Sequence, residues 1–289
     1  MTASNHPRDE SRIRLDSTAH LMHSISSQLA RRLGHIALDG SRRPGPPALV
    51  LVAHGSRDPR ALHTVRALME RIRRLRPAVP VRLGHIELNE PLLPDTLAGL
   101  GGAPAVLVPL LLSRGHHVKR DIPEAVAAAA PHARVAAPLG PHPLLVDTLC
   151  ARLIEAGWRI RTTEAARRGS GIVLAAAGSR DADSAADTRR TARLLADRLG
   201  VPVVPAYASA ATPTVPAALR ALADRGRHRI AVASCFTAPG RFATQCAEQA
   251  PWIASAPLGA HPALAHLVLH RYDQTLATPT SAAPELTSA

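Results

Sequence analysis

The chain has 289 residues, long enough for two domains of ordinary size, and its 46% apolar but only 2% aromatic composition predicts a core of Ala, Val, Leu and Ile. Its net charge of +13 comes almost entirely from arginine and favours a polyanionic partner, but two Phe, two Tyr and two Trp offer few surfaces on which single-stranded nucleic acid could stack. The short apolar runs, the lack of a hydrophobic signal core and three scattered cysteines without a C-x-x-C motif argue against a membrane protein, a disulfide scaffold and a zinc ribbon, and indicate a cytoplasmic protein.

The first part of the chain divides into a polar extension and a regular α/β region. Residues 1–46 are rich in Ser, Arg and His, and we expect a flexible basic extension with one amphipathic helix at 20–38. From Ala48 onward, short apolar runs alternate with segments of helical spacing. This alternation predicts an α/β fold with a parallel sheet and helices on both of its faces. The predicted strands are 48–56, 79–88, 105–112 and 134–140, and the predicted helices are 58–77, 91–100, 121–131 and 142–158.

The pattern then recurs, which indicates an internal duplication. LVLVAHGSRD returns as GIVLAAAGSRD, and the third strand and its turn return as RIAVASCFTAPGRFA, after an offset of roughly 120 residues. We therefore predict two similar lobes with an active-site cleft between them. The predicted boundaries are a first lobe at 47–158, a linker at 159–170, a second lobe at 171–274 and a disordered tail at 275–289.

The duplication separates residues that the fold needs from residues that chemistry needs. The P-L-G-x-H-P motif is present in both copies, so we interpret His142 and His261 as helix-start residues. Polar groups able to bind a metal or move a proton are present in the first copy alone. In the second copy His54 becomes Ala177, Glu87 becomes Ser209, Glu90 becomes Thr212, His117 becomes Phe242 and Asp121 becomes Cys246.

These first-copy residues lie at or just beyond the carboxyl ends of three predicted strands. Because such ends share one edge of a parallel sheet, we expect His54, Glu87 and the pair His116–His117 to converge there. Imidazole with carboxylate suits Fe, Co, Ni or Zn. Two or three protein ligands would leave coordination positions open for a substrate. Taken singly, each histidine is better explained as a turn residue; their joint loss from the second copy favours the metal site.

Three motifs together resemble the class II tetrapyrrole chelatases of the CbiX/SirB type. They are A-H-G-S at 53–56, I-E-L-N-E-P at 86–91, and P-L-L-L-S-R-G-H-H-V-K-R-D-I-P at 109–123. The resemblance implies a two-lobed enzyme that inserts a divalent metal into sirohydrochlorin, with one site between the lobes. It implies that His54 and His117 bind the metal and that Glu87, with Glu90 behind it, is the carboxylate of the site. The same three residues, His54, His117 and Glu87, are the predicted metal ligands and the predicted catalytic residues. His116 is an alternative ligand.

The resemblance also gives the arginine excess a purpose, because sirohydrochlorin carries many carboxylates and Arg binds carboxylates in bidentate fashion. The metal enters as a substrate, with Fe²⁺ favoured and Co²⁺ or Ni²⁺ as alternatives, and no organic cofactor is expected. We expect a monomer or homodimer without nucleic-acid or membrane partners. The residues predicted to contact the ring or border its cleft are Ser56, Arg57, Arg82, Glu90, Arg114, His116, Lys119 and Arg120.

Two other classes of protein remain as alternatives to an enzyme. A degenerate chelatase would bind metal or tetrapyrrole without turnover, but the retained His/Glu/His set in the first copy argues against it. A nucleic-acid-binding protein is supported by charge alone and opposed by the scarcity of aromatic residues.

Overall fold

The computed structural model describes residues 45–130, 132–159 and 163–279. The predicted helix at 20–38, all but two residues of the predicted extension, and the end of the predicted tail lie outside these residues. The described residues from Pro47 onward belong to one compact unit.

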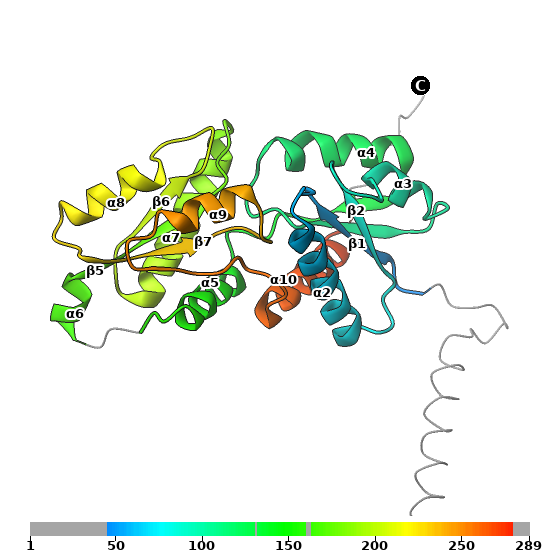
Figure 1. Ribbon diagram of the computed structural model, residues 1–289. Coiled ribbons are helices and arrows are strands. Elements are labelled where there is room, and N and C mark those ends of the chain that lie inside the picture. The colour runs from blue at the N-terminus through cyan, green and yellow to red at the C-terminus, as the bar shows by residue number, and fades with distance from the viewer. Residues whose placement is uncertain (1–44, 131, 160–162, 280–289) are drawn as a thin grey trace, which may run out of the picture. The chain divides into compact units, whose positions relative to one another are not determined.

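Two four-stranded parallel sheets form the framework of this unit (Figure 1). Their orders are β2-β1-β3-β4 and β6-β5-β7-β8, and each neighbouring pair runs parallel. The predicted parallel α/β fold with two similar lobes is confirmed. The strands are β1 (Ala48–Ala53), β2 (Val81–His85), β3 (Ala105–Pro109), β4 (Ala133–Val135), β5 (Ser170–Ala176), β6 (Val203–Tyr207), β7 (Arg229–Ser234) and β8 (Ile253–Ala254).

The helices follow the predicted alternation with three differences. A π-helical turn, η1, precedes the helix predicted at 121–131; the predicted linker contains a short helix, α6; and the last helix, α10, continues three residues into the predicted tail. The bounds are α2 (Pro59–Leu75), α3 (Leu93–Ala98), η1 (His117–Asp121), α4 (Ile122–Ala129), α5 (Pro143–Glu155), α6 (Glu164–Arg168), α7 (Ala182–Leu199), α8 (Val215–Ala223), α9 (Arg241–Glu248) and α10 (Pro262–Ala277).

The central strands are buried on both faces, as helix-covered parallel strands must be. In β1, Leu49 and Leu51 contribute to a core shared by both lobes. Val50 and Val52 point the other way, into a smaller core beside α3 and α4. The second lobe repeats this alternation with Ile172 on the shared side.

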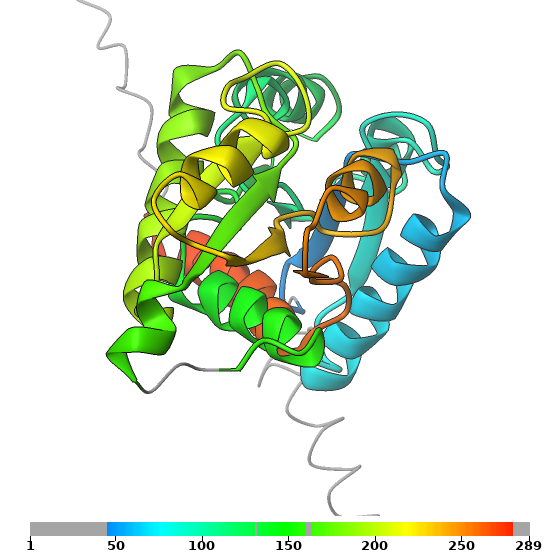
Figure 2. The ribbon, with the colours of Figure 1, turned by 60° about the vertical axis from the view of Figure 1, so that its left-hand side comes forward.

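The last helix of each repeat packs against the other repeat. Helix α5 contacts α7 and β7 of the second lobe, whereas α10 contacts α2 and β3 of the first. The two helices also pack against each other, and in Figure 2 they lie side by side between the lobes. The shared core depends on this exchange, so neither sequence repeat holds a complete hydrophobic core of its own.

His142 and His261 begin these two exchanged helices. The Nδ1 atom of His142 accepts the Leu144 backbone N–H at 3.1 Å, and Nδ1 of His261 accepts that of Ala263 at 3.2 Å. Their predicted role as helix-start residues is confirmed. Burial lowers the pKa of both imidazoles, which suits a cap that must stay neutral to accept.

These caps predict a loss of stability in mild acid. The histidine pKa is near 6.5 in an unfolded chain and lower in the fold, so below about pH 6.5 the unfolded state binds more protons and the free energy of unfolding falls. Replacing both residues with Asn, a cap that does not titrate, should flatten this dependence at a cost of under about 1 kcal/mol at pH 8. Urea unfolding at pH 8 and pH 5.5 measures it. An equally steep pH dependence in the double variant would contradict the role of the caps.

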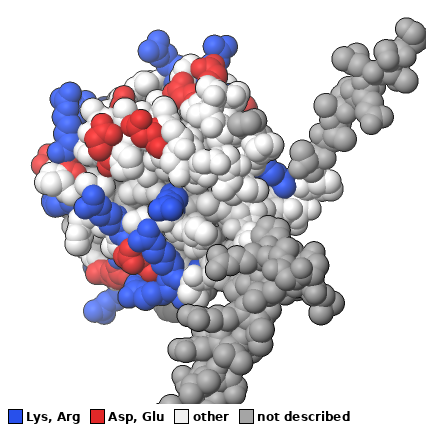
Figure 3. All heavy atoms as spheres, turned by 90° about the vertical axis from the view of Figure 1, so that its right-hand side faces the viewer, with Lys and Arg blue, Asp and Glu red and all other residues white. Residues whose placement is uncertain are grey.

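The charges on the outer surface do not favour a nucleic-acid partner. On the face seen in Figure 3, basic side chains lie among acidic ones and form no continuous basic surface of the kind that nucleic-acid binding uses. No helix in the described part of the chain has the length and apolar character needed to span a membrane.

Candidate functional site

The first-lobe turn that carries His54 depends on Gly55. This glycine has φ = 104°, and a Cβ on it would lie 1.8 Å from the Glu87 carbonyl oxygen. The Glu87 backbone N–H donates to the carbonyl of His54 at 3.0 Å, so the two turns are joined directly. In the second lobe Gly178 and Ser209 repeat the close approach at 1.9 Å, which confirms that Glu87 and Ser209 are equivalent positions.

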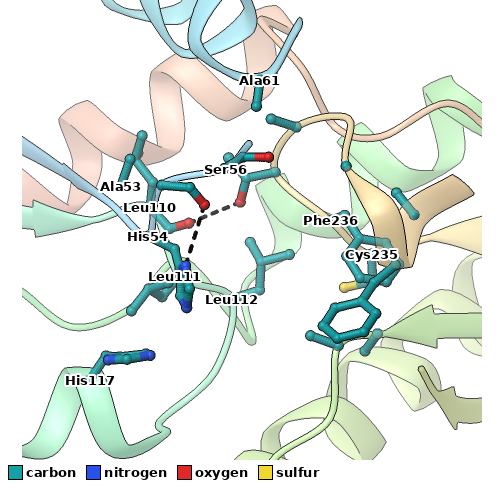
Figure 4. Close-up of a pocket in the computed structure, with 18 of the residues that line it drawn as sticks. Ala53, His54, Ser56, Ala61, Leu110, Leu111, Leu112, His117, Cys235 and Phe236 are labelled. Carbon is teal, nitrogen blue, oxygen red and sulfur yellow. Dashed lines mark hydrogen bonds between the residues drawn. The ribbon is translucent and has the colours of Figure 1, made fainter. Parts of the chain in front are cut away.

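The structure brings three predicted site residues together beyond the strand ends. The ring centroids of His54 and His117 are 4.8 Å apart, and Nδ1 of His54 lies 3.5 Å from Glu87 Oε1. All three side chains are partly exposed. Figure 4 shows the two imidazoles on the same side of a pocket, His54 from the turn after β1 and His117 from the start of η1.

Asp121 orients His117. Its Oδ2 atom lies 2.5 Å from Nδ1 of His117, four residues earlier on the same helical segment. Since a carboxylate accepts, Nδ1 carries the proton and the Nε2 lone pair is left to bind a metal. His116 is more exposed and lies 3.4 Å from Asp121 Oδ1, with its ring 6.3 Å from that of His117. The geometry therefore favours His117 over His116 as the ligand.

The other predicted contact residues differ in whether they line the pocket. Ser56 and Arg57 line the pocket, and the Ser56 backbone N–H donates to Asn89 Oδ1 at 2.7 Å. Glu90 accepts the Leu92 backbone N–H at 3.1 Å and so supports the start of α3. Arg82 and Arg120 are exposed and do not line the pocket.

Arg114 and Lys119 form ion pairs with the second lobe. Arg114 donates to Asp187 at 2.7 Å, and Lys119 lies 2.7 Å from Asp181 and 2.8 Å from Asp183. Burial acts to raise the pKa of Asp187, but the hydrogen bonds and charge of Arg114 outweigh it and hold that pKa below its usual range. These two cations bind α7 in the structure, so a contact with substrate would require breaking an ion pair.

A cavity of about 920 Å³ lies between the lobes. The first lobe contributes His54, His85 and His117, and the second lobe contributes Cys235, Phe236 and Phe242. Figure 4 shows Phe236 and Cys235 on the side opposite the imidazoles. Burial raises the pKa of Cys235 to about 12, so its thiol stays protonated and is a poor metal ligand.

The two imidazoles of His54 and His117 offer nitrogen atoms of the kind that can bind a metal. Within the described residues, no group of three or more His, Cys, Asp or Glu side chains is arranged to hold a metal ion. A pair of imidazoles facing a cavity leaves most coordination positions open, as expected for a metal that passes through rather than one that stabilises the fold.

Comparisons with known proteins identify the family of this chain. The CbiX family model matches residues 48–156 and again 171–275. This chain belongs to the CbiX family. Among curated relatives, a sirohydrochlorin cobaltochelatase of Methanococcus aeolicus is 39% identical over 80 residues, which are 27% of this chain and 56% of that protein. A sirohydrochlorin ferrochelatase of Bacillus subtilis is 29% identical over 176 residues, 57% of this chain and 64% of that protein.

Two solved structures share the fold of this chain. SirB from Bacillus subtilis with Fe³⁺ superposes with a TM-score of 0.66 and 24% identity, covering 80% of this chain and 96% of SirB. CbiX, described as the terminal enzyme for siroheme biosynthesis in denitrifying bacteria, gives a TM-score of 0.58 and 21% identity, covering 80% of this chain and 100% of that one. The chain spans only about half the length of the first curated relative, 56%.

The pocket of this CbiX-family chain contains a histidine that the sequence did not single out. His85, the last residue of β2, is 2% exposed and lines the cavity, and its Nδ1 lies 3.2 Å from the Pro91 carbonyl. Because a carbonyl only accepts, Nδ1 carries the proton and Nε2 is a free acceptor. Burial lowers the pKa of His85, which keeps it neutral. The signal in the sequence was its change to Tyr207 in the second copy.

The Asp121 contact gives a specific prediction. Replacing Asp121 with Asn should lower metal affinity about 10- to 100-fold, because the ring of His117 loses its charged partner and its fixed tautomer. Calorimetric titration with Co²⁺ measures the change. Glu124→Gln, a charge removal one turn later on the neighbouring helix α4, is the matched control and should bind Co²⁺ like the wild type. Equal affinity in the Asp121 variant and the control would rule out the orienting role.

Proposed function

We propose that this protein is a sirohydrochlorin chelatase that inserts a divalent metal, with Fe²⁺ favoured, into sirohydrochlorin for siroheme biosynthesis. The observation that carries the proposal is the pair of imidazoles of His54 and His117, 4.8 Å apart at the wall of a cavity of about 920 Å³. Its membership of the CbiX family and the names of its curated relatives support the same reaction.

Both imidazoles are held in the tautomer that binds a metal. Nδ1 of His117 faces Asp121, and Nδ1 of His54 faces Glu87 Oε1 at 3.5 Å and the Gly55 carbonyl at 3.3 Å. With Nδ1 donating to oxygen, each Nε2 lone pair is free to bind M²⁺. Two neutral ligands on one side would strip part of the water from the metal and leave its other side open to the ring.

Insertion exchanges one M²⁺ for two pyrrole protons, which must leave the ring as the metal enters. Glu87 is the proposed acceptor, because its carboxylate lies beside His54, which lines the cavity, and is half exposed, so a proton taken up there can pass to water. The neutral Nε2 of His85 supports a second route for the other proton from deeper in the cavity.

The proposed ligands support metal insertion as the reaction, but they do not by themselves select one metal. Two imidazoles accept Fe²⁺, Co²⁺ and Ni²⁺ alike, and selectivity often follows metal supply. A cobaltochelatase of cobalamin-type biosynthesis is therefore the alternative function, favoured by the name of the Methanococcus aeolicus relative. The expected cytoplasmic location and the monomer or homodimer stay predictions.

An anaerobic absorbance time course tests the proposal. Purified protein and sirohydrochlorin are mixed with Fe²⁺, Co²⁺ or Ni²⁺ in turn, against controls without protein. Faster insertion with Fe²⁺ than with the others supports siroheme synthesis, and faster insertion with Co²⁺ supports the alternative. A spectral shift on mixing without acceleration by any metal would instead indicate a protein that binds the tetrapyrrole without turnover.

A further inference from the structure

The second lobe has aromatic side chains at two cavity positions where the first lobe has His117 and Leu111. The chain contains only two phenylalanines, and both line the cavity. Phe242 occupies the place of His117, and Phe236 that of Leu111, because the Leu111 and Phe236 carbonyls accept equivalent backbone N–H groups from Leu139 and Leu258 at 2.8 and 2.9 Å. The equivalence extends to Gly115 and Gly240, which precede the two helices. A Cβ built on Gly115 would lie 3.6 Å from Oγ of Ser179 in the second lobe, and one on Gly240 would lie 3.5 Å from Oγ of Ser56 in the first.

Arg241 accompanies Phe242 at the start of α9. Its guanidinium carbon lies 4.9 Å from the centroid of the Phe242 ring, and the residue is exposed and lines the cavity. Among the described residues it has no acidic partner, whereas Arg114 and Lys119 are held by carboxylates of α7. The second-lobe wall thus combines two aromatic surfaces with a cation that is available to an anionic ligand.

We propose that this wall binds the macrocycle: Phe236 and Phe242 contact its flat apolar surface, and Arg241 pairs with a carboxylate at its edge. The inference rests on the proposed function and adds that the first lobe binds the metal while the second lobe binds the ring. Half-buried aromatic side chains suit a flat conjugated ring, and Arg suits a carboxylate geometrically and electrostatically. Phe236 faces the imidazoles across the pocket, so a ring on this wall has one face toward the metal (Figure 4).

Binding of metal-free sirohydrochlorin to the full chain tests this inference. Protein is titrated into the ring anaerobically, and the absorbance change gives Kd. We expect Phe242→Ala and Arg241→Gln each to weaken ring binding about five- to tenfold. The matched control is Arg229→Gln, since Arg229 lies 5.9 Å over the Trp252 ring in the same lobe but does not line the cavity. It should bind the ring like the wild type.

A second readout separates this inference from the proposed function. Calorimetric titration with Co²⁺ should give wild-type affinity for Phe242→Ala and Arg241→Gln, because the imidazoles are untouched. Wild-type ring affinity in both variants, beside accelerated insertion by the wild type, would overturn the inference alone. Ring binding weakened as expected, but without insertion by the wild type, would overturn the proposed function alone. Failure of the wild type to bind the ring would overturn both.

Discussion

Replacing both His54 and His117 with alanine is expected to reduce metal insertion to the uncatalysed rate. Loss of a residue that only orients a metal ligand costs about 10- to 100-fold, and removal of both ligands should exceed that range. The two side chains are partly exposed and outside the hydrophobic cores, so the free energy of unfolding should change by less than about 0.5 kcal/mol. The anaerobic absorbance assay and urea unfolding measure the two quantities.

The matched control for this variant is His63→Ala. His63 is an exposed histidine on α2 that does not line the cavity, so its removal tests whether loss of any imidazole matters. Wild-type rates are expected for this control. Full activity in the double variant of His54 and His117 would remove the basis of the assignment.

Replacing Gly55 with alanine is expected to cause the largest loss of stability, roughly 3 kcal/mol or more. The new Cβ would lie 1.8 Å from the Glu87 carbonyl oxygen, in backbone that cannot move without displacing both His54 and Glu87. Gly178→Ala should be as costly, because its Cβ would lie 1.9 Å from the Ser209 carbonyl oxygen. Metal affinity in the residual folded fraction should fall with Gly55→Ala and stay unchanged with Gly178→Ala.

The variant Gly101→Ala separates the cost of a steric clash at the new Cβ from the cost of placing alanine at a positive φ. Gly101 has φ = 58° but no atom within 4 Å of a built Cβ, so its replacement should cost only about 1 kcal/mol. Urea unfolding of the three variants compares them directly. A loss no larger at Gly55 than at Gly101 would show that the approach of the two turns does not matter for stability.

Much of the fold follows from local pattern. Buried strands such as 48–53 and the recurrence of G-S-R-D predict two parallel α/β lobes, because side-chain periodicity and turn chemistry are local properties. The exchange of α5 and α10 between lobes is not predictable in this way. Both helices have ordinary amphipathic spacing, and their partners are fixed by the shared core, which no segment of the sequence displays.

Some features of the candidate site are also predictable from the sequence, and others are not. The proximity of His54, Glu87 and His117 follows from their place beyond parallel strand ends. The ion-pair partners of Arg114 and Lys119 do not follow from local pattern, because Asp187 lies on α7 of the other lobe and Asp181 caps the start of that helix. The Asp121 contact was within reach of the sequence, since an i, i+4 spacing brings side chains together once 117–121 is helical.

One experiment tests the central claim that a single first-lobe site delivers metal to the ring. The full chain is loaded anaerobically with one equivalent of Co²⁺ and mixed rapidly with excess sirohydrochlorin, and the product is followed by absorbance. We predict one equivalent of metallated ring, formed faster than from free Co²⁺ at the same concentration. The double alanine variant of His54 and His117 should give only the free-metal rate. Product formed at the free-metal rate by the wild type, or at the wild-type rate by the double variant, would contradict the claim.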